Sequence, residues 1–338
     1  MTSLTRSEPL RIAVSAVAPV DWLRRRWLRL LGPLARPLMV RRELRVALLA
    51  TCAIASAATA TLLIPLWILA LGPIVWGIPH LLGDLRYLVI QPGFHRRAAL
   101  WLAAGVPILA TALGADVLFG FLGAAGAVLV SRAGAGRKLL GLVTVGALAA
   151  ALAACGGARD IVFAHAHNLV AVLLWWAWRP RTTRLHWLPL ALYVGVSALL
   201  LSDLALALAA GGLSRALGPL DHVYQVARLS PGLSGSLATR LVLLYAFAQT
   251  IHYVVWLVLL PDDDRARVTP PTFAGSVRGL WRDVGGAVVI VTTILCCGLA
   301  VWAVLDLMAA NHGYFRMARF HGHLELAAAA ALWMEARR

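Results

Sequence analysis

Charged residues are scarce in this sequence, where Asp, Glu, Lys and Arg make up 14% of 338 residues. Soluble domains contain about 25% charged and roughly 45–50% apolar residues, whereas 61% of this chain is hydrophobic. An apolar excess of this size cannot be buried in a water-soluble core. The composition therefore excludes soluble enzyme folds and predicts an all-α, polytopic integral membrane protein.

Cysteine is also rare, with four residues and no C-x-x-C pair. The absence of paired spacing argues against a disulfide framework or a cysteine zinc site. We interpret Cys52, Cys155, Cys296 and Cys297 as small apolar side chains. The sequence also lacks a G-x-x-x-x-G-K-[ST] motif and any loop long enough for a soluble catalytic domain. Any chemistry is therefore expected inside the bilayer.

Lysine is nearly absent, since Lys138 is the only lysine among 31 basic residues, and acidic residues number 15. In a soluble protein the net charge of +16 would suggest nucleic acid binding. Here most arginines fall between long apolar runs, where the positive-inside rule places them. We therefore expect membrane lipid, and no nucleic acid, as the partner of this charge. The expected location is a cell membrane, such as a bacterial inner membrane, in multi-pass form.

The first part of the chain, residues 1–45, is expected to be a basic cytoplasmic segment. No cleaved signal peptide is evident in it. Apolar residues recur at helical spacing beside a cluster of arginines, which predicts an amphipathic helix on the membrane surface. The apolar positions are Val20, Leu23, Trp27, Leu30 and Leu31, and the arginines are Arg24, Arg25, Arg26 and Arg29. Residues 46–338 are expected to form a single transmembrane domain.

Apolar runs between arginines, glycines and prolines predict about ten membrane helices, with eight as the alternative. The predicted spans are 46–63, 67–90, 98–113, 116–131, 139–155, 160–178, 186–210, 237–260, 284–309 and 314–335. The distribution of basic residues favours an even number of spans with cytoplasmic N- and C-termini, and Arg337 and Arg338 lie on that side. The stretch 211–236 is expected to carry a short re-entrant or interfacial helix.

The ten histidines are not explained by a membrane location alone. Four predicted spans each contain at least one, and a polar group in lipid is costly unless it is paired. His80 precedes Asp84, and His321 precedes Glu325, by one helical turn. Because imidazole binds transition metals and carboxylates orient it, a shared metal site is expected. Candidate ligands are His80, His165, His167, His252, His321 and His323, and candidate catalytic groups are Asp84, Glu325 and Tyr253.

Other polar residues leave alternatives open. Each histidine taken alone could instead be a hydrogen-bonding contact between helices. Asp203 is a third acid within an apolar segment, without a partner that the sequence identifies. His222 and His312 could cap the site, whereas His95 and His186 are expected at helix ends near the membrane surface.

One motif resembles that of a known family. The run Gly77-Ile78-Pro79-His80, followed by Asp84, is similar to the G-x-P-H-x3-D signature of the bacteriorhodopsin-related Brp/Blh family. Members are membrane proteins that cleave β-carotene to retinal with a histidine-bound iron and O2. The family has Gly after this histidine and a later W-H-x3-H pair, whereas this chain has Leu81 and a single His252. The resemblance implies an iron ligand at His80.

These observations lead to one principal functional hypothesis and two alternatives. The principal hypothesis is a non-heme iron oxygenase, with one or two Fe2+ ions and O2, that acts on a carotenoid or another apolar polyene or lipid. The first alternative is a desaturase- or hydroxylase-type metallo-oxidase of lipid or quinone. The second is an ion or metal transporter, in which His80, Asp84, His321, Glu325 and Asp203 form a relay. The oligomeric state is not predicted.

Overall fold

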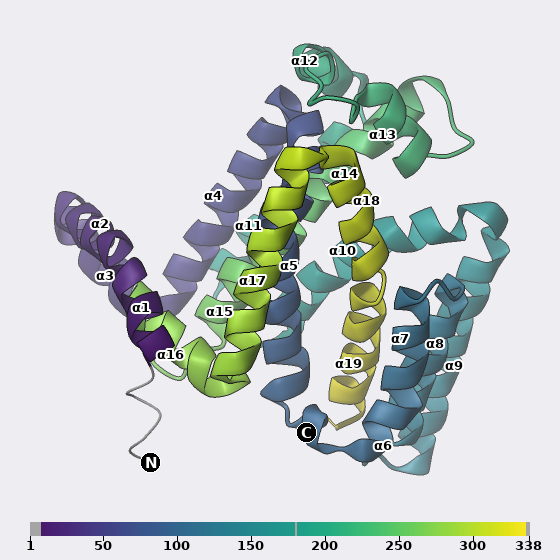
Figure 1. Cartoon of the computed structure of the whole chain (residues 1–338), viewed down its shortest axis with the longest axis horizontal. Coiled ribbons are helices and arrows are strands. Elements are labelled where there is room, and N and C mark those ends of the chain that lie inside the picture. The colour runs from purple at the N-terminus through teal and green to yellow at the C-terminus, as the bar shows by residue number, and fades with distance from the viewer. Residues whose placement is uncertain (1–7, 180, 336–338) are drawn as a thin grey trace.

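The computed structural model describes residues 8–179 and 181–335, and Figure 1 shows the arrangement of the chain. Within these ranges the regular elements are helices, and the sole exception is an isolated bridge between Leu217 and Leu220. The all-α prediction is therefore confirmed. Arg337 and Arg338 lie outside the described residues, and the predicted orientation of the termini stays a prediction.

Six helices are long and apolar enough to cross a membrane. They are α4 (Arg42–Leu63), α5 with its π-helical extension (Pro65–Ile90), α9 (Ala135–Ala154), α10 with its preceding turn (Gly156–Ala177), α14 continuing through α15 (Gly235–Asp263), and α17 (Gly286–Leu305). Such an architecture is that of a helical membrane protein.

The predicted count of ten spans is not supported, although every predicted segment contains helix. Two predicted spans are shorter apolar helices, Ala98–Ala112, which ends in α7 (Val106–Ala112), and α8 (Val117–Leu129). A third is a pair, α11 (Trp187–Leu200) and α12 (Asp203–Leu213), bent by 78° at the intervening break. The last divides between α18 (Leu307–Ala318) and α19 (His321–Glu335). Counting the bent pair as one span raises the number to seven.

The shorter helices pack against one another. Helix α8 contacts α7, α9 and α19, and these helices lie together on the right of Figure 1. Apolar residues stay exposed on their outer faces, such as Leu113 (78%) at the end of α7 and Leu122 (56%) on α8, although both helices are shorter than a typical membrane span. Hydropathy therefore detects these segments without showing whether each one crosses the membrane.

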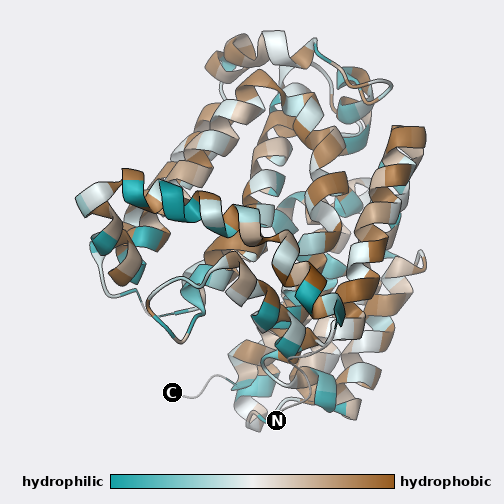
Figure 2. Ribbon diagram, turned by 60° about the vertical axis from the view of Figure 1, so that its left-hand side comes forward, coloured by the Kyte–Doolittle hydropathy of each residue, from teal (hydrophilic) through white to brown (hydrophobic). Residues whose placement is uncertain are grey.

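The long helices present apolar residues outward. In Figure 2 hydrophobic residues predominate along them, whereas hydrophilic ones gather in the connections and in a helix that lies across the bundle. On α17, Val304 and Leu305 are 87% and 79% exposed. In water such a surface would promote aggregation, but in a bilayer it contacts lipid tails.

The N-terminal region forms α1 (Glu8–Ala16), α2 (Ala18–Leu30) and α3 (Ala35–Val40). The helix expected near residues 20–31 is therefore present, and Trp27 and Leu30 on it are exposed. The Asp21 carboxylate accepts backbone N–H groups of Phe273 (2.7 Å) and Ala274 (3.0 Å) at the start of α16 (Phe273–Val284). This contact fixes the N-terminal helices to α16, and their location at a membrane surface stays a prediction.

The stretch 211–236 does contain a short helix, α13 (His222–Leu229). Asp221 caps it, because its side chain accepts the backbone N–H of Tyr224 at 2.8 Å. Buried ion pairs tie the opposite end of α14 and α15 to the bundle, with Arg45 2.8 Å from Asp262 and Arg181 2.6 Å from Asp263. Ser230 Oγ, at the end of α13, lies 3.3 Å from the carbonyl oxygen of Ala238 on α14, so both ends of the helix that carries His252 are held in place.

Close packing of α8 depends on glycine. A Cβ atom added at Gly126 would lie 2.0 Å from the carbonyl oxygen of Ala103, a backbone atom that cannot move aside alone. Gly146 on α9 is a matched control, because a Cβ atom there would meet nothing within 4 Å.

Gly126→Ala should therefore destabilise the protein by about 1–3 kcal/mol through overpacking. Gly146→Ala should be neutral or stabilising by up to roughly 1 kcal/mol, since alanine favours helix over glycine. Thermal unfolding of both variants in detergent tests this prediction. Equal changes for the two variants would contradict the packing described for α8.

Candidate metal centre

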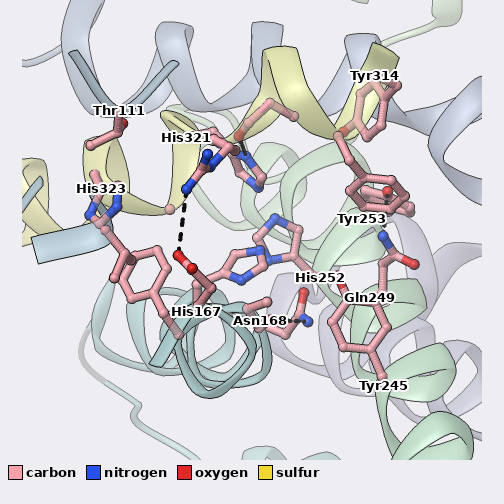
Figure 3. Close-up of a pocket in the computed structure, with 18 residues that line it drawn as sticks. Thr111, His167, Asn168, Tyr245, Gln249, His252, Tyr253, Tyr314, His321 and His323 are labelled. Carbon is pink, nitrogen blue, oxygen red and sulfur yellow. Dashed lines mark hydrogen bonds and ion pairs between the residues drawn. The ribbon is translucent and has the colours of Figure 1, made fainter. Parts of the chain in front are cut away.

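Four helices each bring one histidine to a common point inside the bundle. His80 comes from α5, His167 from α10, His252 from α14 and His321 from α19. Neighbouring rings are 5.0–5.2 Å apart between centroids, in the order 80, 252, 167, 321 and back to 80. The rings of His252 and His321 are 5.7 Å apart. We call these four residues the histidine cluster; Figure 3 shows three of them.

Helix geometry is irregular close to two of these histidines. The helix of His80 continues after Asp84 as a π-helical segment, Leu85–Ile90, and the helix of His252 continues as another, Val255–Leu259. Such wide turns are common at functional sites. Gly77, one turn before His80, allows Tyr314 to approach, because a Cβ atom there would lie 2.3 Å from the tyrosine ring.

The imidazole nitrogens are arranged for coordination. His80, His252 and His321 each offer one ring nitrogen, and these three atoms lie within 4.8 Å of one another. His80 Nδ1 faces the carbonyl oxygen of Trp76 at 3.1 Å, and His321 Nδ1 contacts that of Ala318. Because a carbonyl only accepts, each Nδ1 carries the proton and each Nε2 keeps its lone pair.

Unpartnered nitrogen atoms indicate what the cluster can bind. Within the described residues, His80 Nε2 and both ring nitrogens of His252 are buried without a hydrogen bond. Such atoms are costly in a low-dielectric interior unless they meet a partner. Neutral imidazoles with free lone pairs fit a transition metal such as iron, zinc, copper or nickel. The arrangement can therefore hold a metal ion.

Two carboxylates lie beside the cluster. Glu325 accepts the Trp256 indole N–H at 2.7 Å, and its same oxygen is 3.4 Å from His252 Nε2. Asp84 follows His80 by one turn, is fully buried, and receives no hydrogen bond from the described residues. Each of the two acids follows a clustered histidine by one helical turn, Asp84 after His80 and Glu325 after His321. A cation in the cluster would offset the repulsion between two such groups.

A cavity of about 360 Å3 adjoins the histidine cluster. His167, His252 and His321 form one of its walls, and Tyr253, whose ring is 4.7 Å from that of His80, lies on another. Phe163, Val117 and Phe315 supply apolar lining. The more exposed Asp160 and Arg319 also line it, and their ion pair measures 3.5 Å. A substrate in this space would lie directly against three of the four imidazoles.

Two predicted ligands lie apart from the cluster. His165 Nε2 contacts the Leu229 carbonyl at 3.1 Å, and its ring packs edge-on to Tyr245. His323 lines the cavity but stacks on Phe163, with 4.2 Å between ring centroids. Each lies two positions along the chain from a clustered histidine. Residues at that spacing on an α-helix point about 200° apart, so only one of each pair can face the cluster.

Other polar residues have structural partners elsewhere. Asp203, expected within an apolar span, is instead exposed at the start of α12 and pairs with Arg240. The break before α12 brings it to the surface. His222 contacts Thr239 Oγ1 at 3.1 Å, and His312 hydrogen-bonds Tyr224, so neither caps the cluster. His186 lies at the start of α11, as expected of a helix end; it is buried and 3.4 Å from the Thr183 hydroxyl, and its location near a membrane surface stays a prediction.

Sequence reasoning did not assign a role to several polar residues that line the cavity. They are Thr111, Asn168, Tyr245, Gln249 and Tyr314. Helical spacing provides a signal for some of them, since Gln249 precedes His252 by three residues and Tyr245 precedes Gln249 by four. For Tyr314 no such signal exists, because it reaches the cavity from a different helix.

Comparison with protein-family models, with curated proteins and with solved structures gave no match. The resemblance to the Brp/Blh family therefore rests on the motif from Gly77 to Asp84.

Alanine at His80, His252 or His321 should abolish binding of about one metal ion per chain, because each removes a ligand. His165→Gln is the matched control, since its amide can still contact the Leu229 carbonyl and it leaves the cluster intact. Elemental analysis of purified, metal-loaded protein measures the difference. Equal metal content in His252→Ala and His165→Gln would show that the cluster is not the binding site.

Proposed function

We propose that this protein is a membrane-embedded non-heme iron oxygenase that oxidises an apolar polyene or lipid, with oxidative cleavage of a carotenoid-like chain as its reaction. The observation that carries the proposal is the histidine cluster, in which buried imidazoles with unpartnered nitrogens adjoin a cavity. His80, His167, His252 and His321 would hold Fe2+, and the ion would supply the position at which O2 binds and is activated.

The electrostatics of the site suit a divalent cation. Neutral imidazoles add no charge, so Asp84 and Glu325 in their ionised forms would balance the two positive charges of Fe2+. Net neutrality lowers the cost of placing the ion in the low-dielectric interior. Glu325 would also accept an N–H of His252 and orient its ring, as carboxylates do beside metal-binding histidines.

The cavity supports a reaction that needs only O2. Cleavage of a carbon–carbon double bond by O2 places one oxygen atom in each of two carbonyl products, so the electrons balance without a reductant. Phe163 and Phe315 offer apolar contacts to the chain, and His167, His252 and His321 lie against it. The cavity walls would exclude water and hold one bond near the cluster, and Tyr253 would help to position it.

The two alternative functions receive less support. A desaturase or hydroxylase needs two electrons from a donor in each turnover. The described elements include no separate domain that would bind such a donor. A transporter would use a chain of ionisable residues, but Asp203, one of its expected members, pairs with Arg240 at the surface. No specific observation favours either alternative over the oxygenase.

Expression in carotene-producing cells under 18O2 tests the proposed function. We expect iron-dependent formation of an aldehyde that carries 18O, abolished by His252→Ala and retained by His165→Gln. The aldehyde must be trapped as it forms, because its oxygen exchanges with water. Iron-loaded protein that forms no labelled product from carotenoids or membrane lipids would overturn the proposal.

Glu325→Gln should weaken iron binding about 10- to 100-fold, because the amide keeps an acceptor for Trp256 but removes the negative charge. Glu335→Gln is the control, since Glu335 is at the end of α19 and pairs with Arg97 at 2.7 Å. Competition with a chelator measures both affinities. An unchanged affinity of Glu325→Gln for iron would show that Glu325 does not contribute to iron binding.

A further inference from the structure

The cavity has a polar wall that an apolar hydrocarbon would not satisfy. Asn168 and Gln249 line it and are only 1% and 4% exposed. Figure 3 shows both amides beside His252, with Tyr245 and Tyr253 next to them. We call these four residues, Asn168, Tyr245, Gln249 and Tyr253, the amide wall.

The amide of Asn168 has a defined orientation. Its Nδ2 donates to the Ala164 carbonyl oxygen at 3.1 Å, and that oxygen can only accept. The Oδ1 atom must therefore face away from the Ala164 carbonyl. Within the described residues it is buried and receives no hydrogen bond. Asn168 thus presents a fixed acceptor on a residue that lines the cavity.

Gln249 adds a second acceptor. Its Nε2 lies 3.0 Å from the Tyr253 hydroxyl, while its Oε1 is buried and receives no hydrogen bond from the described part of the chain. Tyr245 stands one helical turn before Gln249, and both residues line the cavity together with Asn168. Both acceptors therefore lie on one wall, close to the histidine cluster.

Buried acceptors without donors disfavour a purely hydrocarbon ligand. Such a ligand has no donor and would leave both carbonyl oxygens unsatisfied, which is costly in a low-dielectric interior. A ligand with a hydroxyl group would donate to one of them instead. Sites built around a hydrogen-bonded hydroxyl reject analogues that lack it far more strongly than apolar pockets reject extra or missing carbons.

We propose that the cavity binds a lipid alcohol or phenol, whose hydroxyl group donates to Asn168 or Gln249 while its unsaturated chain packs against Phe163, Val117 and Phe315. The inference deepens the proposed function and rests on it, because it names the substrate class of the same site. The hydroxyl group fixes the chain at the amide wall, and this contact determines which bond lies beside the histidine cluster.

Binding of matched fifteen-carbon probes tests the proposal without relying on turnover. The probes are radiolabelled farnesol, its methyl ether and farnesene, measured in nanodiscs that contain the protein and corrected for uptake by empty nanodiscs. The ether keeps an acceptor oxygen but has no donor. Farnesol should bind saturably and about tenfold or more tightly than either analogue.

Substitution of the amides should remove this preference. Asn168→Leu and Gln249→Leu should bring the affinity for farnesol close to that for the ether. Gln225→Leu is the matched control, because Gln225 is also a buried glutamine without a partner among the described residues but does not line the cavity. This control should keep the full preference, and thermal unfolding checks that all three variants are folded.

The outcomes distinguish this inference from the proposed function. Equal binding of alcohol, ether and hydrocarbon by folded protein that holds iron overturns the hydroxyl site and leaves the oxygenase intact. A preference for farnesol in protein that binds no iron overturns the oxygenase and leaves the hydroxyl site intact. A preference that survives both Asn168→Leu and Gln249→Leu shows that another group binds the hydroxyl.

Discussion

The cost of burying polar groups where water is absent governs this structure. Lipid supplies no hydrogen bonds, so each histidine and carboxylate inside the bundle must find a partner or bind something. Most of them find a partner: His165 contacts a backbone carbonyl, and Asp262 and Asp263 pair with arginines. His80 Nε2, both ring nitrogens of His252 and both carboxylate oxygens of Asp84 are among the buried groups that have no partner in the described residues. A cation bound at the histidine cluster would satisfy these nitrogens and balance the carboxylate charge.

The surrounding helices hold the histidine cluster in position. Ion pairs of Asp262 and Asp263 and the packing of α13 hold α14 at its two ends, and close packing of α8 supports α19. Rigid support of this kind matters because coordination tolerates only small errors in the position of each ligand. The cavity lies between these supported helices, so the same framework shapes the metal site and the space next to it.

The sequence predicted the helical class, the apolar segments and the four histidine-bearing helices. It could not choose between His165 and His167, or between His321 and His323, because the rotation of a helix about its axis depends on packing. It misplaced Asp203, because hydropathy does not reveal a 78° bend between two apolar helices. The amide wall was missed for a related reason: Asn168 and Gln249 become informative only when their hydrogen-bond partners are known.

The proposed function depends on one iron ion bound by imidazoles from four helices. X-ray absorption at the iron K-edge of the loaded protein tests it most directly, because imidazole rings produce characteristic multiple scattering from their outer atoms. Binding at the histidine cluster predicts three or four histidine ligands per iron and no sulfur neighbour. A spectrum with only oxygen neighbours, or with sulfur bound to the iron, would contradict it.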